Sequence, residues 1–293
     1  MKLADALEEF LLNQQIKGNS PYTLKFYKNT LGMFVAKQGA DCQTEAIKQA
    51  DLNQYYISLI SREIASTTIQ TYVRALRAFL NWCYAEGYTP ACLPDKFRLP
   101  KAKRNVIDIL TPGEIKTLLA SFNRADVIQN RNYCMVILML DSGLRMNEVI
   151  NMRLSSVRLQ ESYVIVDGKG NKQRIIPIGL NTRKALLKYM SVRPPVLYDN
   201  VFLTVNNEPV RKSTVNNIFR KFRRRTGITR LRAHLLRHTF ATLYLENGGD
   251  IYSLQSILGH TSLDMVKKYI HTTPRKTVVN FGNFSPVDNL AKT

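Results

Sequence analysis

A proline-containing stretch near residue 100 most constrains how this 293-residue chain can fold. Between Thr89 and Arg104 it reads TPACLPDKFRLPKAKR, with three prolines and no apolar periodicity. Proline removes a backbone donor and blocks helix continuation, so no regular element can run through this stretch. We therefore predict a linker over residues 91–106, with one domain on each side of it.

The two sides of the linker differ in charge. Residues 1–100 carry 11 lysines and arginines against 9 acidic residues, whereas the remaining 193 residues carry 31 against 13. Almost all of the net charge of +20 therefore belongs to the C-terminal two-thirds. Charge of this size attracts a polyanion, so we expect a nucleic-acid partner, with a merely solvated basic surface as the alternative. In the linker, Lys101, Lys103 and Arg104 could follow a phosphate backbone, or belong to an ordinary exposed connection.

Composition and motifs exclude several classes of protein. The first thirty residues contain no uninterrupted apolar core, and the longest apolar run, Met135 to Leu140, is too short to cross a bilayer. We therefore expect a soluble, cytoplasmic protein with no membrane partner. The four cysteines form no CxxC or Cys/His cluster, which argues against a disulfide framework or a zinc site. No DxD cluster, HExxH motif or Walker loop is present, so we expect no cofactor and no metal.

Residues 1–90 have the periodicity of a helical bundle. We expect helices over residues 5–16 and 22–38, the second with Ser20 as its cap and Pro21 at its first position. A third helix should begin at Asp51, and a fourth should run from Ser66 to about Gly87.

The part after the linker, residues 107–275, mixes helices with strands. Thr111 is the expected cap of its first helix, and an apolar helix should follow over residues 131–140. Two β-branched runs, over residues 163–167 and 174–178, flank a glycine-containing turn and predict a hairpin. The final third again indicates helix. The expected fold class is mainly α, with a small antiparallel β-sheet or hairpin in the second domain.

The segment DSGLRMNEV contains the first candidate functional residue. Gly143 permits a tight turn, which would place Arg145 in or beside a first helical turn, near the positive end of the helix dipole. That position suits a phosphate. Glu148, three residues on, could hold the guanidinium in place. A surface Arg–Glu pair is the structural alternative.

Lys169 lies in the turn GKGNK, where two glycines allow a tight turn with a projecting lysine. A lysine at a hairpin tip could donate a proton to a leaving oxygen. Lys172 and Arg174 could contact backbone phosphates. A basic, solvated hairpin is the alternative.

The segment HLLRH is more informative. The i, i+3 spacing puts His234 and Arg237 on one helix face, where a proton acceptor lies beside a guanidinium that can bind phosphate. His238 is interpreted as structural. Residues 220–232 hold seven basic residues in thirteen, and we expect this stretch to lie against DNA. The candidate contacts are Arg220, Lys221, Arg223 and Arg224.

The segment LGHTS should end one helix at Gly259 and begin the next. His260 then lies on a short turn, nine residues before Tyr269. Taken singly, such a histidine is typical of a helix cap and such a tyrosine of a half-buried core. Tyr244 and Tyr252 are equally good candidates by composition for any role of a tyrosine.

Two arginines, a lysine, two histidines and a tyrosine are together what phosphoryl transfer to a hydroxyl nucleophile needs without a metal. The stretches SGLRMNEV, VDGKGNKQRIIPIG, HLLRHTFAT, ILGH and KKYIH resemble, in order and spacing, those of the tyrosine recombinases, the family of phage integrases and bacterial Xer recombinases. The resemblance covers about residues 1–275. By this resemblance, the six catalytic positions are Arg145, Lys169, His234, Arg237, His260 and Tyr269.

The resemblance also implies a reaction. Tyr269 would attack a scissile phosphate, giving a 3′-phosphotyrosyl link and a free 5′-hydroxyl. The other implied roles are charge stabilisation by Arg145 and Arg237, a hydrogen bond from His260 to a non-bridging oxygen, assistance as a base by His234, and protonation of the leaving oxygen by Lys169. The covalent link retains the bond energy, so rejoining would need neither ATP nor metal.

An architecture follows from the same resemblance. Residues 1–90 would be a SAM-like core-binding domain that closes a two-domain, C-shaped clamp around duplex DNA, and residues 107–275 would be the catalytic domain. The tail 276–293 would dock on a neighbouring protomer, with a frayed terminus as the alternative. The implied assembly is a homotetramer on paired DNA sites, with an accessory DNA-bending or directionality protein as a possible further partner.

Two other functions stay open: a catalytically silent DNA-binding regulator on the same scaffold, and a type IB topoisomerase. All six positions hold the expected residue types, which argues against a silent regulator, and the GKGNK turn favours a recombinase. The residues do not decide between integration, excision, inversion and dimer resolution, nor do they identify the target sequence. Because the chain begins with the core-binding segment, we expect a simple type without an arm-binding domain.

Overall fold

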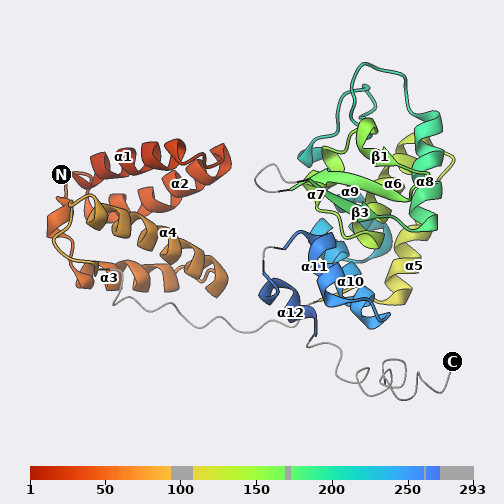
Figure 1. Ribbon diagram of the computed structural model, residues 1–293. Coiled ribbons are helices and arrows are strands. Elements are labelled where there is room, and N and C mark those ends of the chain that lie inside the picture. Colours follow the sequence, from red (N-terminus) through yellow and green to blue (C-terminus); the bar gives the residue numbers. More distant parts are fainter. Residues whose placement is uncertain (94–107, 169–172, 261, 271–293) are drawn as a thin grey trace, which may run out of the picture. The chain divides into compact units, whose positions relative to one another are not determined.

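The computed structural model describes residues 1–93, 108–168, 173–260 and 262–270. The chain divides into two compact units, Met1–Asn105 and Val106–Thr293 (Figure 1). Each unit has its own hydrophobic core. Several residues singled out above lie outside the described ranges: Lys101, Lys103, Arg104, Lys169, Lys172 and the tail 276–293.

The described part of the first unit is helical. Its elements are α1 (Leu3–Ile16), α2 (Pro21–Gln38), the short 3-10 helix η1 (Thr44–Ala46), α3 (Gln49–Ile60) and α4 (Ser66–Ala85). The expected helix limits agree within two residues. The Ser20 hydroxyl accepts a hydrogen bond from the Thr23 amide at 3.2 Å, and Pro21 is the first helical residue, as predicted.

Aromatic rings fill the core of this unit. Phe10 is 1% exposed and meets Tyr27 and Phe79 edge-on, at centroid distances of 5.2 and 5.4 Å. Phe34 and Tyr55 form a similar pair at 5.1 Å. Edge-to-face geometry adds to the free energy gained from burying the ring area. The unit is thus stabilised by its own helix stripes and contains none of the candidate catalytic residues.

The second unit carries the strands and the candidate site. Its helices are α5 (Pro112–Ala120), α6 (Val127–Asp141), α7 (Met146–Ile150), α8 (Leu180–Val192), α9 (Lys212–Thr226), α10 (Ala233–Glu246), α11 (Ile251–Leu258) and α12 (Asp264–Ile270). The remaining elements are η3 (Leu154–Ser156), β1 (Val157–Arg158), β2 (Tyr163–Asp167) and β3 (Gln173–Pro177). The Thr111 hydroxyl caps α5 by accepting from the Glu114 amide, as predicted.

The three strands form one antiparallel sheet in the order β1-β2-β3. Val164 pairs with Ile176, and Val166 pairs with Arg174. Because side chains alternate along a strand, these four share the face that is turned to the core. The predicted fold class, mainly α with a small antiparallel sheet, is confirmed, and β1 is a short strand that the sequence pattern did not predict.

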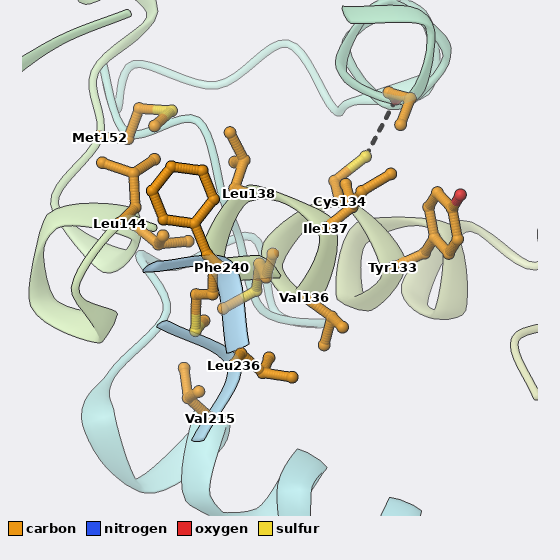
Figure 2. Close-up of a cluster of buried hydrophobic side chains, with 14 of the residues drawn as sticks. Tyr133, Cys134, Val136, Ile137, Leu138, Leu144, Met152, Val215, Leu236 and Phe240 are labelled. Carbon is orange, nitrogen blue, oxygen red and sulfur yellow. Dashed lines mark hydrogen bonds between the residues drawn. The ribbon is translucent and has the colours of Figure 1, made fainter. Parts of the chain in front are cut away.

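Helix α6 forms the centre of the second core. Residues 130–139 of this helix are all buried, and α6 packs against both α8 and α10. Figure 2 shows Val136 and Leu138 of α6 beside Leu236 and Phe240 of α10. Such close packing fixes the position of α10 relative to the C-terminal end of α6. Site residues lie in α10 and just after α6. In the described ranges, no helix combines the length and the apolar character needed to span a bilayer.

Candidate active site

A tight turn after α6 positions Arg145. Gly143 has φ +62°, and a Cβ there would lie 2.3 Å from the Phe240 ring, so only glycine fits this turn. Arg145 directly precedes α7. Its amide and its Nη1 donate to the Glu148 carboxylate at 2.8 and 2.9 Å, and its Nη2 donates to the Gly259 carbonyl at 3.3 Å. The Arg145 side chain remains 36% exposed, so it can still meet a ligand.

Glu148 is shared between two arginines. Its side chain is 8% exposed and accepts from both Arg145 and Nη2 of Arg174, at 2.9 Å in each ion pair. Arg174 is 14% exposed and also donates from Nε to the Ile257 carbonyl at 3.0 Å. The phosphate contact of Arg174 stays a prediction: its guanidinium joins β3 to α7 and α11, and the side chain also lines the cleft described below. Strand alternation was the available signal for these contacts within the chain, because Arg174 shares its face with buried Ile176.

Arg237 lies deeper than Arg145, at 5% exposed. Its Nη1 donates to the Gly143 carbonyl at 2.6 Å and its Nη2 to the Leu258 carbonyl at 2.7 Å, so the guanidinium satisfies carbonyls at two chain reversals. Nη2 also lies 3.2 Å from Nε2 of His260. Burial, and secondarily the charge of Arg145, lower the pKa of Arg237 to about 10. The side chain is thus still a cation at neutral pH.

His260 is placed by the end of α11. Gly259 closes this helix in the left-handed conformation, with φ +59°, as the sequence predicted. A Cβ on Gly259 would lie 3.0 Å from Cζ of Arg174, so the turn packs closely on that side chain. The turn brings His260 against Arg237 and into the wall of the cleft.

The structure separates the three candidate tyrosines. Tyr269, in α12, is 1% exposed, and its hydroxyl lies 2.7 Å from Nδ1 of His238. Burial raises the pKa of Tyr269, while the nearby charges of Arg237 and Arg145 oppose that rise. Tyr244, by contrast, packs against Phe240 in a tilted ring pair and lies close to Gly249, and Tyr252 is 64% exposed.

His238, interpreted as structural from the sequence, is the histidine that contacts the Tyr269 hydroxyl. His234 and His238 are four residues apart in α10, a step that returns to nearly the same helix face. The i, i+4 spacing was therefore the signal that could have identified His238. Their surroundings differ, because His234 is exposed and lines the cleft whereas His238 contacts the tyrosine hydroxyl.

A cleft of about 980 Å³ joins these elements. Its wall includes the candidate catalytic residues Arg145, His234 and His260. Arg237 contacts the cleft residue His260, and the Tyr269 hydroxyl contacts His238. Gly168 and Gln173, on either side of the segment that contains Lys169, also line the cleft. In the described residues, no group of three or more histidine, cysteine, aspartate or glutamate side chains is arranged to bind a metal ion.

The basic residues of the stretch 220–232 differ in what they contact. Arg223 lines the cleft from α9, together with Lys212 and Asn216 on the same helix face, and so does Arg232. The other predicted DNA contacts, Arg220, Lys221 and Arg224, are exposed.

The remaining two arginines of the stretch donate to groups of this chain. Arg225 donates to the Ser121 carbonyl at 2.8 Å, and Arg230 is held by Asp108 and Glu114. That the stretch lies against DNA stays a prediction, and these two arginines are already engaged by partners in the chain.

Both units of the chain match known protein families. Residues 108–276 match the Phage integrase family, and residues 7–87 match the N-terminal SAM-like domain of phage integrases. The chain is 29% identical over 290 residues to Tyrosine recombinase XerD of Halalkalibacterium halodurans, covering 96% of this chain and 97% of that protein.

Two solved structures extend the comparison. The XerA recombinase is 27% identical, with a TM-score of 0.54 over 96% of this chain and 99% of that one. The Tn1549 transposon integrase in complex with circular intermediate DNA has a TM-score of 0.76 at 18% identity, over 92% of this chain and 95% of that chain. At that identity the second likeness concerns the fold.

Proposed function

This chain belongs to the phage integrase family of tyrosine recombinases, and we propose that it cleaves and rejoins duplex DNA with Tyr269 as the nucleophile. As a family member with a Xer relative along nearly its whole length, it is a site-specific DNA recombinase. The exchange that we propose proceeds through a 3′-phosphotyrosyl link, which stores the energy of the broken phosphodiester for rejoining.

One observation carries the assignment of the site. Side chains from α7, α10, α12 and the turn after α11 line one cleft, although more than a hundred residues separate the first from the last. A phosphodiester in that cleft would lie beside the partly exposed guanidinium of Arg145 and the imidazoles of His234 and His260. Fixed cations and hydrogen-bond donors stabilise the charge that builds on non-bridging oxygens during phosphoryl transfer.

Each residue then takes a role. Arg145 and Arg237 stabilise the negative charge on the pentacoordinate phosphorane transition state. His260, in contact with Arg237, donates to a non-bridging oxygen. His234 contacts the phosphate from the cleft wall, and Lys169 protonates the leaving 5′ oxygen. Because Tyr269 is buried, the residues that cover its hydroxyl have to move when DNA binds, so that the hydroxyl can reach the phosphate in the cleft.

The basic residues around the cleft suggest the path of the bound DNA. The face of α9 that contains Arg223 meets the backbone beside the scissile phosphate, and exposed Arg220, Lys221 and Arg224 extend that contact. The linker residues Lys101, Lys103 and Arg104, with Lys172, continue the track. The helical unit closes a C-shaped clamp, and four protomers on paired sites exchange strands, with the tail 276–293 docking on a neighbour.

Covalent adduct formation tests this function. The full chain is first used to select its binding site from random duplexes, and the selected duplex is then nicked so that cleavage releases a short fragment and traps the adduct. Wild type should give an adduct that survives denaturation, Tyr269→Phe should give none while binding the duplex, and Tyr244→Phe should behave as wild type. Absence of a wild-type adduct on the selected site would refute the enzyme, and adduct loss in Tyr244→Phe would refute the nucleophile.

A further inference from the structure

His238 is the imidazole in direct contact with the proposed nucleophile. Its Nδ1 lies 2.7 Å from Oη of Tyr269, and the two ring centroids are 5.7 Å apart at an interplanar angle of 48°. His238 comes from α10 and Tyr269 from α12, two helices that pack together (Figure 1). A nucleophile and a nitrogen base within 2.6–3.2 Å of each other are the usual sign of an activated nucleophile.

The chemistry of the two groups sets the direction of this hydrogen bond. A buried phenol stays protonated at neutral pH, because burial disfavours its anion. The lone pair of a neutral imidazole nitrogen accepts a proton more readily than a phenol oxygen does. The Tyr269 O–H therefore donates to Nδ1, and the ring proton of His238 lies on Nε2.

We infer that His238 is the general base of the cleavage step, accepting the Tyr269 proton on Nδ1 as Oη attacks phosphorus. This inference rests on the proposed function and deepens it by naming the group that activates the nucleophile. It also revises the role that family resemblance suggested for His234. That side chain lies one helical turn away and lines the cleft, so it faces the phosphate.

The step balances in protons and bonds. The O–H bond of Tyr269 breaks, its proton moves to Nδ1 of His238, and the Oη–P bond forms. The bond from phosphorus to the 5′ oxygen breaks, and that oxygen takes a proton from the general acid, proposed as Lys169. On rejoining, the 5′-hydroxyl attacks phosphorus and the His238 imidazolium returns its proton to Oη.

The surroundings make this transfer depend on substrate. Burial raises the pKa of Tyr269, and the charges of Arg237 and Arg145 oppose that rise, which favours release of the phenol proton. Transfer of that proton to His238 adds a further positive charge to the site. A bound phosphate adds the negative charge that offsets the new cation. The hydroxyl is thus activated when DNA is in place and stays protonated before.

Isosteric variants separate a base from a group that only orients the phenol. His238→Asn places an amide near the position of Nδ1, where it can accept the hydrogen bond but cannot take up the proton. The experiment measures the single-turnover rate of adduct formation by the full chain on the selected, nicked duplex. The expected result is a rate at least ~10²-fold below wild type for both His238→Asn and His238→Ala, with unchanged duplex affinity. Free imidazole should raise the rate of His238→Ala by about 10-fold or more, as expected when an external base replaces a missing one.

A near-wild-type rate in His238→Asn, or no response of His238→Ala to imidazole, would overturn the inference. Duplex affinity and the unfolding midpoint of each variant show that the loss is chemical and not a loss of folding. The outcome is distinct from failure of the proposed function, which would appear as absence of adduct in wild type. If wild type reacts and His238→Asn reacts equally well, the recombinase stands and the base lies elsewhere.

Discussion

The two walls of the cleft hold their arginines in different ways. The first wall consists of Arg145, Glu148 and Arg174, where one nearly buried carboxylate accepts from two guanidiniums. The second wall contains His260, and Arg237, in contact with His260, donates to the Gly143 and Leu258 carbonyls. In the described part of the chain, Arg237 forms no ion pair.

This difference teaches how a protein fixes a cation without neutralising it. A carboxylate holds a guanidinium but cancels one unit of charge, so the first wall has a net charge of about +1 for two arginines. Carbonyl dipoles hold Arg237 without cancelling its charge, and burial of this charged group lowers its pKa. The second wall therefore attracts an anion more strongly per arginine than the first.

The largest expected effect breaks the second wall. Arg237→Lys keeps the charge but loses the planar fork that reaches Gly143 and Leu258 together. Loss of one fixed donor to a charged transition state costs roughly 10²–10³-fold in rate. We expect at least that loss in single-turnover adduct formation, with duplex affinity retained. Arg124→Lys, a cation stacked on Tyr133, is the control and should react as wild type. Equal rates for Arg237→Lys and the control would remove Arg237 from the chemistry.

The next effect breaks the first wall. Glu148→Gln leaves two guanidiniums side by side without their carboxylate, and removal of one partner from a buried ion pair costs about 3–5 kcal/mol. Because Arg145 is 36% exposed, we expect about 3 kcal/mol of lost unfolding free energy in urea titrations. Glu114→Gln is the matched control, since its pair with Arg230 is more exposed and should cost about 1 kcal/mol. Equal losses would show that burial of Glu148 adds nothing.

A smaller effect tests the contact between Gly259 and Arg174, which joins the two walls. Gly259 and Gly227 both end helices in the left-handed conformation, at φ +59° and +73°, but only Gly259 lies against a neighbour, the Arg174 guanidinium. Alanine pays about 1–2 kcal/mol for this conformation at either site. Gly259→Ala should lose about 1 kcal/mol more than Gly227→Ala in unfolding free energy, and should also slow adduct formation. The same loss of unfolding free energy at both positions would mean that the Arg174 side chain moves aside without destabilising the protein.

The smallest effect is a pH dependence. The pKa of Arg237, lowered to about 10 by burial, makes this side chain a cation below that pH and neutral above it. Stabilisation of the Tyr269→Phe variant by sulfate, relative to chloride at equal ionic strength, should be about 1 kcal/mol at neutral pH and vanish as the pH rises through about 10. Adding Arg237→Met should abolish most of the stabilisation at every pH. A sulfate effect that survives this second substitution would place the anion elsewhere.

The sequence by itself determined much of the local structure. Apolar periodicity and caps located the helices of the first unit and the starts at Ser20 and Thr111, because these depend on neighbours a few residues away. The helix end at Gly259 was predictable for the same reason. Even the inward direction of Arg174 was present in the strand alternation, although its charge suggested a solvent-facing role.

Only the tertiary structure decided which side chains are free to act. Arg174 meets Ile257 across 83 residues of sequence, and Arg230 meets Glu114 across 116, so charge alone could not separate internal arginines from those available to DNA. Tyr269 likewise differs from Tyr244 by the packing of α12 on α10, which sets its hydroxyl against His238. Contacts between distant segments depend on topology, which local patterns do not encode.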